Sequence, residues 1–140
     1  MTLNFSISYP LFFCYDVYTM KIIFMVDDND ANLLLAKNAL DGIYETYAMP
    51  SAARLFKIIE KITPDLILLD VDMPEMDGFQ ALEILKANER LKSIPVVFLT
   101  GKDEPESEKR GRELSAVDFI HKPFSAPLLI ERIKMLIGNN

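Results

Sequence analysis

The sequence of 140 residues contains very little thiol or imidazole chemistry: it has one cysteine, Cys14, one histidine, His121, and no tryptophan. A single cysteine cannot form an intrachain disulfide, and one Cys with one His cannot make a thiolate or imidazole metal site. Any bound metal must therefore be a hard cation held by oxygen ligands. Because no disulfide framework exists, we expect a cytoplasmic location.

Positive charge is also scarce. The chain has 21 acidic and 15 basic side chains, which gives a net charge of −6. Nonspecific binding to nucleic acid or to an anionic membrane depends on clustered Lys and Arg side chains. We therefore expect no direct binding to nucleic acid or membrane.

The N-terminal segment is apolar but contains no uninterrupted hydrophobic run long enough to span a membrane. Residues 1–20 hold thirteen apolar side chains and one charge, Asp16, with Pro10 and several polar residues between them. A membrane span needs about 20 continuous apolar residues, and a secretory signal needs basic residues before its apolar run. We expect residues 1–19 to be an extension outside the fold, 20–138 to form the domain, and 139–140 to be a tail. In the alternative interpretation, the extension is an arm that packs on the domain or on a second copy.

From Lys21 onward, short apolar runs alternate with segments of helical spacing. The runs predict strands at 21–26, 44–48, 65–69, 96–99 and 117–120. Four of them are apolar nearly throughout, as in strands covered on both faces, whereas 44–48 resembles an edge strand. Ser51 and Ser125 are predicted helix caps, and Gly138 a helix end. Alternating strands and helices predict an α/β fold with a doubly wound, five-stranded parallel sheet.

Polar residues end or follow four of these strands, and the carboxyl ends of parallel strands meet at one edge of a sheet. They are Asp27, Asp28, Asp70, Thr100 and Lys122. Carboxylates repel by about 1 kcal/mol per pair at 4 Å in water, and by several times more at lower effective dielectric. Lys122 supplies one compensating charge, and a divalent cation would supply the rest.

This residue set suits a phosphoryl group. Asp70 can act as a carboxylate nucleophile that forms an acyl phosphate. The Thr100 hydroxyl and the Lys122 ammonium can hold phosphoryl oxygens as charge builds on them. Taken singly, each residue has a structural explanation as a helix cap, a β-former or a loop residue. Their joint placement favours a functional site.

Several motifs, in this order and spacing, resemble the receiver domain of bacterial two-component response regulators over about Lys21–Ile137. They are Asp27-Asp28, Leu68–Gly78 (LLDVDMPEMDG), Leu99–Gly101 and Lys122–Phe124. The resemblance implies a flavodoxin-like sheet of order 2-1-3-4-5, with Asp70 as phosphoacceptor. It also implies a Mg²⁺ ion held by Asp28, Asp70 and the main-chain carbonyl of Asp72, with Asp27 helping through water, and a cis Lys122–Pro123 peptide.

The resemblance further implies a signalling function without turnover of an external substrate. A sensor histidine kinase or phosphotransfer protein would donate the phosphoryl group, and the chain would catalyse its own phosphorylation. Thr100 would then move toward the phosphoryl group, and Phe119 would turn inward. The surface of the fourth helix, fifth strand and fifth helix would change for a downstream target protein or a separate output domain. A homodimer is a further partner to expect.

Residues 101–113 depart from the family pattern. They carry nine charged side chains and no large apolar one, and Ser115 stands where the family commonly has glycine. We expect the helix in this segment to bury little and to be held loosely. Lys102 is placed to form an ion pair with Asp72 above the phosphoryl site.

Two alternatives keep part of this pattern. Asp70-Val71-Asp72 after an apolar strand also resembles the opening motif of haloacid-dehalogenase-like phosphatases, although the acidic metal ligands of that family would have to follow Lys122. The second alternative is a degenerate receiver that acts as a binding module. Because the chain ends just past the final helix, we expect a stand-alone receiver or a fragment of a longer protein.

Overall fold

The structure, a computed structural model, describes residues 20–101 and 105–138. The predicted extension 1–19, the tail 139–140 and Lys102, with its predicted ion pair to Asp72, lie outside the described residues. The strands are β1 (Ile22–Val26), β2 (Glu45–Met49), β3 (Leu66–Asp70), β4 (Val96–Thr100) and β5 (Asp118–His121). The helices are α2 (Asp30–Leu40), α3 (Ala52–Ile58), α4 (Gly78–Ala87), α5 (Pro105–Glu113) and α6 (Ala126–Ile137).

The five strands form one parallel sheet in the order β2-β1-β3-β4-β5, so the predicted fold class and strand order are confirmed. The second strand lies at an edge, as its alternating pattern predicts. The predicted strand boundaries are wrong by about one residue. Asp70 and Thr100 each form the last residue of a strand because their backbones stay in register, with Leu99 and His121 respectively.

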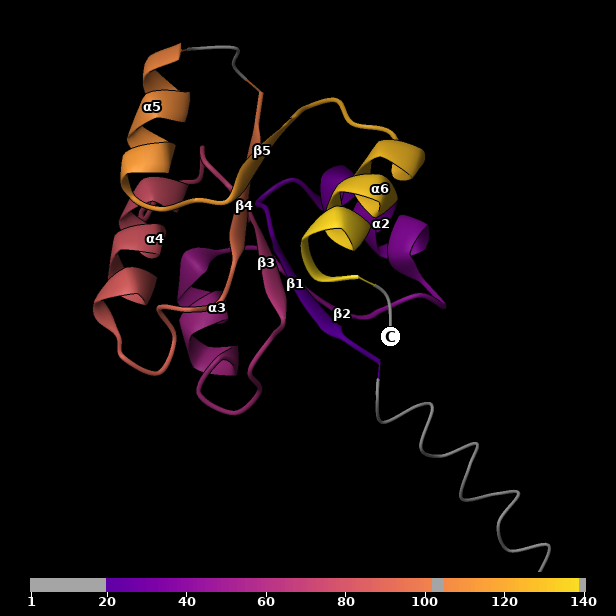
Figure 1. The fold of residues 1–140 in the computed structure, drawn as a ribbon, viewed down its shortest axis with the longest axis horizontal. Helices are drawn as coiled ribbons and strands as arrows, with labels where there is room; N and C mark the ends of the chain where they lie inside the picture. The colour runs from indigo at the N-terminus through magenta and orange to yellow at the C-terminus, as the bar shows by residue number, and fades with distance from the viewer. Residues whose placement is uncertain (1–19, 102–104, 139–140) are drawn as a thin grey trace, which may run out of the picture.

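Two helical layers cover the sheet (Figure 1). Helices α3, α4 and α5 lie on one side, and α2 and α6 lie on the other. Successive residues of β3 face opposite layers: Leu68 packs into the cluster under α2 and α6, whereas Ile67 and Leu69 pack into the other. All five β3 residues are buried. Each fully buried Leu or Ile side chain contributes about 1.5–3 kcal/mol, so the central strand is a stiff support for Asp70.

Polar side chains cap the helices that begin at the carboxyl edge of the sheet. Ser51 and Ser125 accept hydrogen bonds from the backbone N–H groups of Arg54 and Leu128, so both predicted caps are confirmed. Asp77 forms a reciprocal capping box with Gln80 at the start of α4. Such caps satisfy backbone donors that the first helical turn leaves unpaired.

Helix α5 buries a single residue, Gly111, which confirms that this helix buries little. Its looseness stays a prediction. Two residues after the end of α5, Ser115 has a φ of 74°, in the left-handed region that favours glycine. The N–H groups of Ser115 and Ala116 donate to the carbonyls of Arg112 and Gly111, as in a glycine-terminated helix end. Ser115 therefore adopts the conformation that the family's glycine would supply.

Candidate functional site

The predicted site residues meet at the carboxyl edge of the sheet. Asp27 follows β1, Asp70 and Thr100 end β3 and β4, and Lys122 follows β5. Asp27, Asp70 and Thr100 are buried, and the side chain of Lys122 is 19% exposed. The polar groups of the site are therefore largely withdrawn from solvent. The Lys122–Pro123 peptide is cis, as the resemblance implied.

Lys122 lies between two buried carboxylates. Its Nζ donates to Oδ1 of Asp70 at 2.8 Å and contacts Oδ2 of Asp27 at 3.4 Å. The backbone N–H of Lys122 donates to the carbonyl of Thr100 at 2.7 Å, which ties the lysine to the end of β4. One ammonium thus balances one of two carboxylate charges at the site.

Two asparagines support Asp27: Asn29, the N-cap of α2, and Asn32 in its first turn. The Oδ1 atom of Asp27 accepts a hydrogen bond from the backbone N–H of Asn29 at 2.9 Å, and its Oδ2 accepts one from Nδ2 of Asn32 at 3.1 Å. Asn32 is not among the site residues predicted from the sequence. Its position in the first turn of the helix that follows Asp27 is the only sequence signal for this contact.

Burial dominates the electrostatics of Asp70. Desolvation raises the pKa of the Asp70 carboxyl to about 7, and the charge of Asp27 adds to this, although the hydrogen bond and charge of Lys122 act in the opposite direction. Burial lowers the pKa of Lys122, but its hydrogen bond to Asp70 and the two carboxylate charges outweigh that effect, so its pKa is raised overall. Lys122 is therefore cationic at neutral pH, and the pocket still carries uncompensated negative charge when Asp70 ionises.

The carboxylates could hold a metal ion. Asp27, Asp28 and Asp70 each present an oxygen, and these oxygens lie within 4.8 Å of one another. An all-oxygen set with excess negative charge fits a hard divalent cation. Asp28 and Asp72 are exposed. The Asp72 carboxylate does not belong to this cluster. The predicted metal ligand from Asp72 is its main-chain carbonyl, and that role stays a prediction.

Gly78 sets the approach of α4 to the site, a role that the sequence analysis did not assign. A Cβ at this position would overlap the main-chain oxygen of Asp70 and would lie 2.9 Å from Cα of Val71. The Gly78 N–H donates to the Val71 carbonyl at 2.9 Å. Only glycine lets α4 begin this close to the end of β3.

Phe119, the predicted switch aromatic, is buried and lies beside Phe98, with 5.7 Å between ring centroids. Phe98 and Thr100 are two residues apart on β4, so their side chains share one face of the sheet. Thr100 and Phe119 thus lie on the same side of the sheet, on neighbouring strands.

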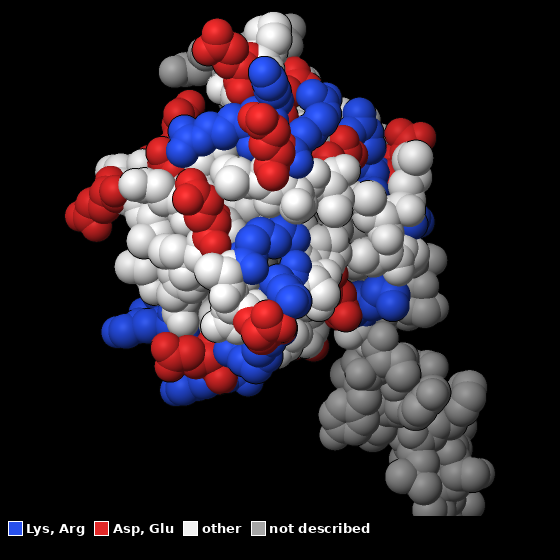
Figure 2. All heavy atoms as spheres, turned by 60° about the vertical axis from the view of Figure 1, so that its left-hand side comes forward, with Lys and Arg blue, Asp and Glu red and all other residues white. Residues whose placement is uncertain are grey.

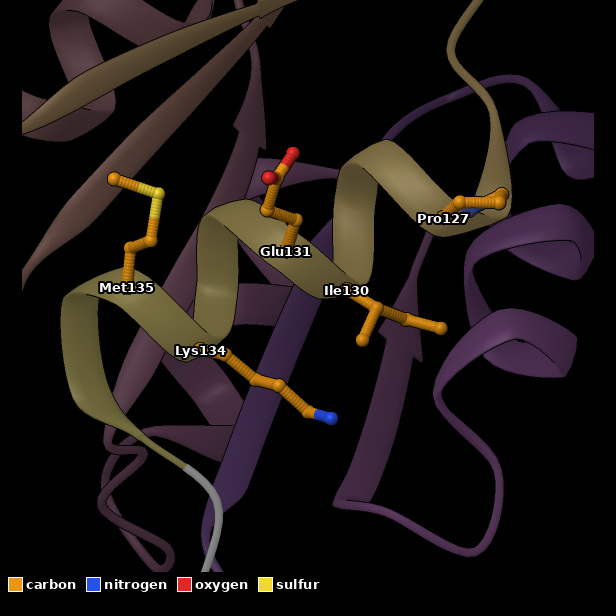
Figure 3. A pocket seen from close by; sticks show the side chains of 5 residues that line it. All are labelled: Pro127, Ile130, Glu131, Lys134 and Met135. Carbon is orange, nitrogen blue, oxygen red and sulfur yellow. The ribbon is translucent and has the colours of Figure 1, made fainter.

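A separate surface groove of about 610 Å³ lies on α6. Its lining residues are Pro127, Ile130, Glu131, Lys134 and Met135. In Figure 3, Glu131 and Met135 project from one side of the helix, and Ile130 and Lys134 from the other. None of the predicted site residues lines this groove, so it is not the phosphoryl site. Within residues 20–101 and 105–138, no helix is both long and apolar enough to cross a membrane.

A doubly wound parallel sheet with three carboxylates and a lysine at its carboxyl edge is the architecture of a phosphoacceptor signalling domain. A sequence model of the response regulator receiver domain matches residues 23–134. The chain therefore belongs to the family of response regulator receiver domains, which function in two-component signalling and are generally not enzymes.

Two curated relatives cover very different shares of their own chains. The chain is 36% identical over 137 residues to a "Probable cyclic di-GMP phosphodiesterase" of Vibrio cholerae, which covers 98% of this chain and 31% of that protein. It is 33% identical over 120 residues to the polar-differentiation response regulator DivK of Brucella ovis. That alignment covers 85% of this chain and 98% of DivK. The shared region is therefore one receiver-sized unit.

The structure resembles that of the chemotaxis protein CheY4 of Vibrio cholerae. The two share 25% sequence identity and superpose with a TM-score of 0.80 over 84% of this chain and 98% of CheY4. The similarity extends over nearly the whole of that receiver.

Proposed function

We propose that this receiver accepts a phosphoryl group on Asp70. The observation that carries the proposal is the Lys122 ammonium, held 2.8 Å from a buried carboxylate and 3.4 Å from a second one. A structural ion pair needs one carboxylate. A second carboxylate with a third beside it leaves excess negative charge, which a divalent cation would balance. The same cation and the Lys122 ammonium could then neutralise phosphoryl oxygens next to Asp70.

The proposed transfer is an in-line displacement at phosphorus. A carboxylate oxygen of Asp70 forms the new P–O bond while the P–N bond of the donor's phosphohistidine breaks. The departing imidazole nitrogen keeps the electron pair and takes up a proton. Lys122 and the Thr100 hydroxyl hold the phosphoryl oxygens, whose charge increases during the transfer.

A Mg²⁺ ion fits the carboxylate set described above. Asp28, Asp70 and the main-chain carbonyl of Asp72 would hold it, with Asp27 contributing through water. When bound, Mg²⁺ neutralises charge on the phosphoryl oxygens. The chain's own part is to keep the carboxylates apart and oriented, which Asn29 and Asn32 do for Asp27.

The response is proposed to follow from Thr100 and Phe119. Thr100 moves toward the phosphoryl group and Phe119 occupies the inward position. The equilibrium between two conformations of the surface formed by α5, β5 and α6 then shifts. The donor is a sensor histidine kinase or phosphotransfer protein in the cytoplasm. The recipient is a downstream target protein, an output domain or a second copy of the chain.

The test is intact-mass measurement after incubation with acetyl phosphate and Mg²⁺. We expect the mass of one phosphoryl group to be added per chain, and no addition in Asp70→Asn. Asp30→Asn, which removes an exposed carboxylate at the start of α2, is the matched control and is expected to be labelled normally. Chelation of Mg²⁺ is expected to prevent labelling.

The alternatives give different results in the same experiment. Repeated turnover of a small phosphate ester would identify a haloacid-dehalogenase-like phosphatase. Failure of both acetyl phosphate and beryllofluoride to modify or bind the unaltered chain would identify a degenerate receiver. Labelling that persists in Asp70→Asn would move the phosphoacceptor elsewhere.

A further inference from the structure

Three aromatic rings form a continuous row under α5. Phe79 of α4 and Phe98 of β4 have ring centroids 5.2 Å apart, and Phe98 and Phe119 of β5 have centroids 5.7 Å apart. All three residues are buried. This aromatic row joins α4 to β5 across the strand that ends in Thr100.

Helix α5 contacts the aromatic row through the backbone of Gly111. A Cβ on Gly111 would overlap Cζ of Phe119 and would lie 2.7 Å from its Cε2 and 3.1 Å from Cδ2 of Phe98. Real Cβ atoms essentially never approach other heavy atoms as closely as this one would approach the Phe119 ring, and the contact with Phe98 would be tight. The ring of Phe119 therefore occupies space that the side chain of any other residue at position 111 would take.

The two residues beside Gly111 extend this contact with guanidinium groups. Cζ of Arg110 lies 4.4 Å from the centroid of Phe79, and Cζ of Arg112 lies 5.4 Å from that of Phe119. Both distances are within the range of cation–π attraction. Carboxylates hold the arginines in turn: Arg110 lies 3.8 Å from Glu83 of α4, and Arg112 lies 3.2 Å from Glu108.

Helix α5 is thus attached by a small backbone contact flanked by cations, without an inserted aliphatic side chain. Charges of both signs crowd the upper part of the face in Figure 2, at the height of α5 in Figure 1. Such a contact is sensitive to one methyl group at its centre, because the neighbouring side chains are largely exposed and cannot replace it.

We propose that Gly111 is a positioning residue that holds Phe119 inward and thereby favours phosphorylation at Asp70. The inference rests on the proposed function, in which the inward ring and the phosphorylated state favour each other. Linkage makes this preference reciprocal: if binding at Asp70 favours the inward ring by a given factor, the inward ring favours binding at Asp70 by that factor. A change that excludes the inward ring must therefore weaken binding at Asp70. Gly111→Ala is such a change, because its methyl group would take the space that the Phe119 ring occupies.

The experiment measures the affinity of four chains for beryllofluoride with saturating Mg²⁺: unaltered, Gly111→Ala, Phe119→Ala and the double variant. Gly111→Ala is expected to weaken binding by about fivefold or more, the lower range of allosteric coupling. In the Phe119→Ala background the same glycine substitution is expected to have no effect, because the ring that it displaces is gone. Lys109→Ala, an exposed change two residues away on α5, is the matched control and is expected to bind normally.

The outcomes separate the two proposals. Absence of binding by the unaltered chain would refute the proposed function. If the unaltered chain binds beryllofluoride, two results would refute the role of Gly111. One is an equal affinity in Gly111→Ala. The other is that Gly111→Ala weakens binding by the same factor whether residue 119 is Phe or Ala. A second measurement does not depend on any variant folding: NMR of the unaltered chain is expected to show cross-relaxation between the Gly111 α-protons and the Phe119 ring. Its absence would also refute the inference.

Discussion

Replacement of Lys122 by methionine isolates the electrostatic part of the site. Methionine keeps an unbranched stem of similar length and removes the ammonium. The variant loses contacts of 2.8 Å to Asp70 and 3.4 Å to Asp27, both with carboxylates that are buried. Removal of one partner from a buried ion pair lowers the free energy of unfolding by about 3–5 kcal/mol, because the remaining charge has no partner. We expect a loss of this size near pH 8 without Mg²⁺.

The loss should become smaller as the pH falls. The pKa of Asp70 is raised to about 7 in the folded chain, above its ordinary value of 3.8, so folded Asp70 binds its proton more tightly than unfolded Asp70. Asp70 therefore reduces stability progressively as the pH rises from about 4 to about 7, and without Lys122 this decline continues to higher pH. Near pH 5.5 Asp70 is largely protonated, and only the Asp27 contact is lost. The expected loss there is about 1–2 kcal/mol.

Urea unfolding followed by circular dichroism measures these differences, in chelator and in Mg²⁺. Because a divalent cation supplies the missing positive charge, saturating Mg²⁺ should recover about 2 kcal/mol or more near pH 8. Lys37→Met, an exposed change in the last turn of α2, is the control and should shift stability by less than about 0.5 kcal/mol. Equal losses for Lys122→Met at both pH values, together with no recovery in Mg²⁺, would refute the electrostatic account.

Three further predictions concern single positions. Asp70→Asn removes the buried charge and should raise the free energy of unfolding near pH 8 by roughly 2–4 kcal/mol without Mg²⁺. A lower free energy of unfolding, measured with urea, would contradict the raised pKa of Asp70. Gly78→Ala places a methyl group against the backbone of Asp70 and should lower stability by about 1–3 kcal/mol in thermal unfolding, so normal stability would argue against the close approach of α4. Ser115→Gly relieves a φ of 74° and should stabilise by about 0.5–1 kcal/mol, and an unchanged midpoint would place the end of α5 in another conformation.

Much of the fold could be predicted because its signals are local. Runs of apolar residues reveal strands covered on both faces, and residues such as Ser51 and Ser125 mark the helix starts. The predicted end of the central strand was wrong by one residue, because the apolar run stops at Leu69 whereas the backbone pairing continues through Asp70. Hydrogen bonding between strands depends on the neighbouring strand, which a local pattern does not contain.

The sequence by itself also determined which chemistry the site can perform. In a parallel sheet all carboxyl ends lie at one edge, so Asp27, Asp70, Thr100 and Lys122 had to gather there once the strands were assigned. The scarcity of Cys and His restricted any metal to oxygen ligands. The phosphoacceptor role of Asp70 and the switching role of Phe119 stay predictions for the experiments above.

Only the tertiary structure decided how strongly these groups interact and what supports them. The pKa of Asp70 depends on its burial and on a lysine 52 residues away in the sequence. The contact between Gly111 and Phe119 depends on where α5 lies over the sheet. The sequence of α5 contains no large apolar residue, so no hydrophobic pattern indicates which side of this helix faces the sheet. Both effects depend on contact distances between residues that are far apart in the sequence, and only the packing of the folded chain fixes those distances.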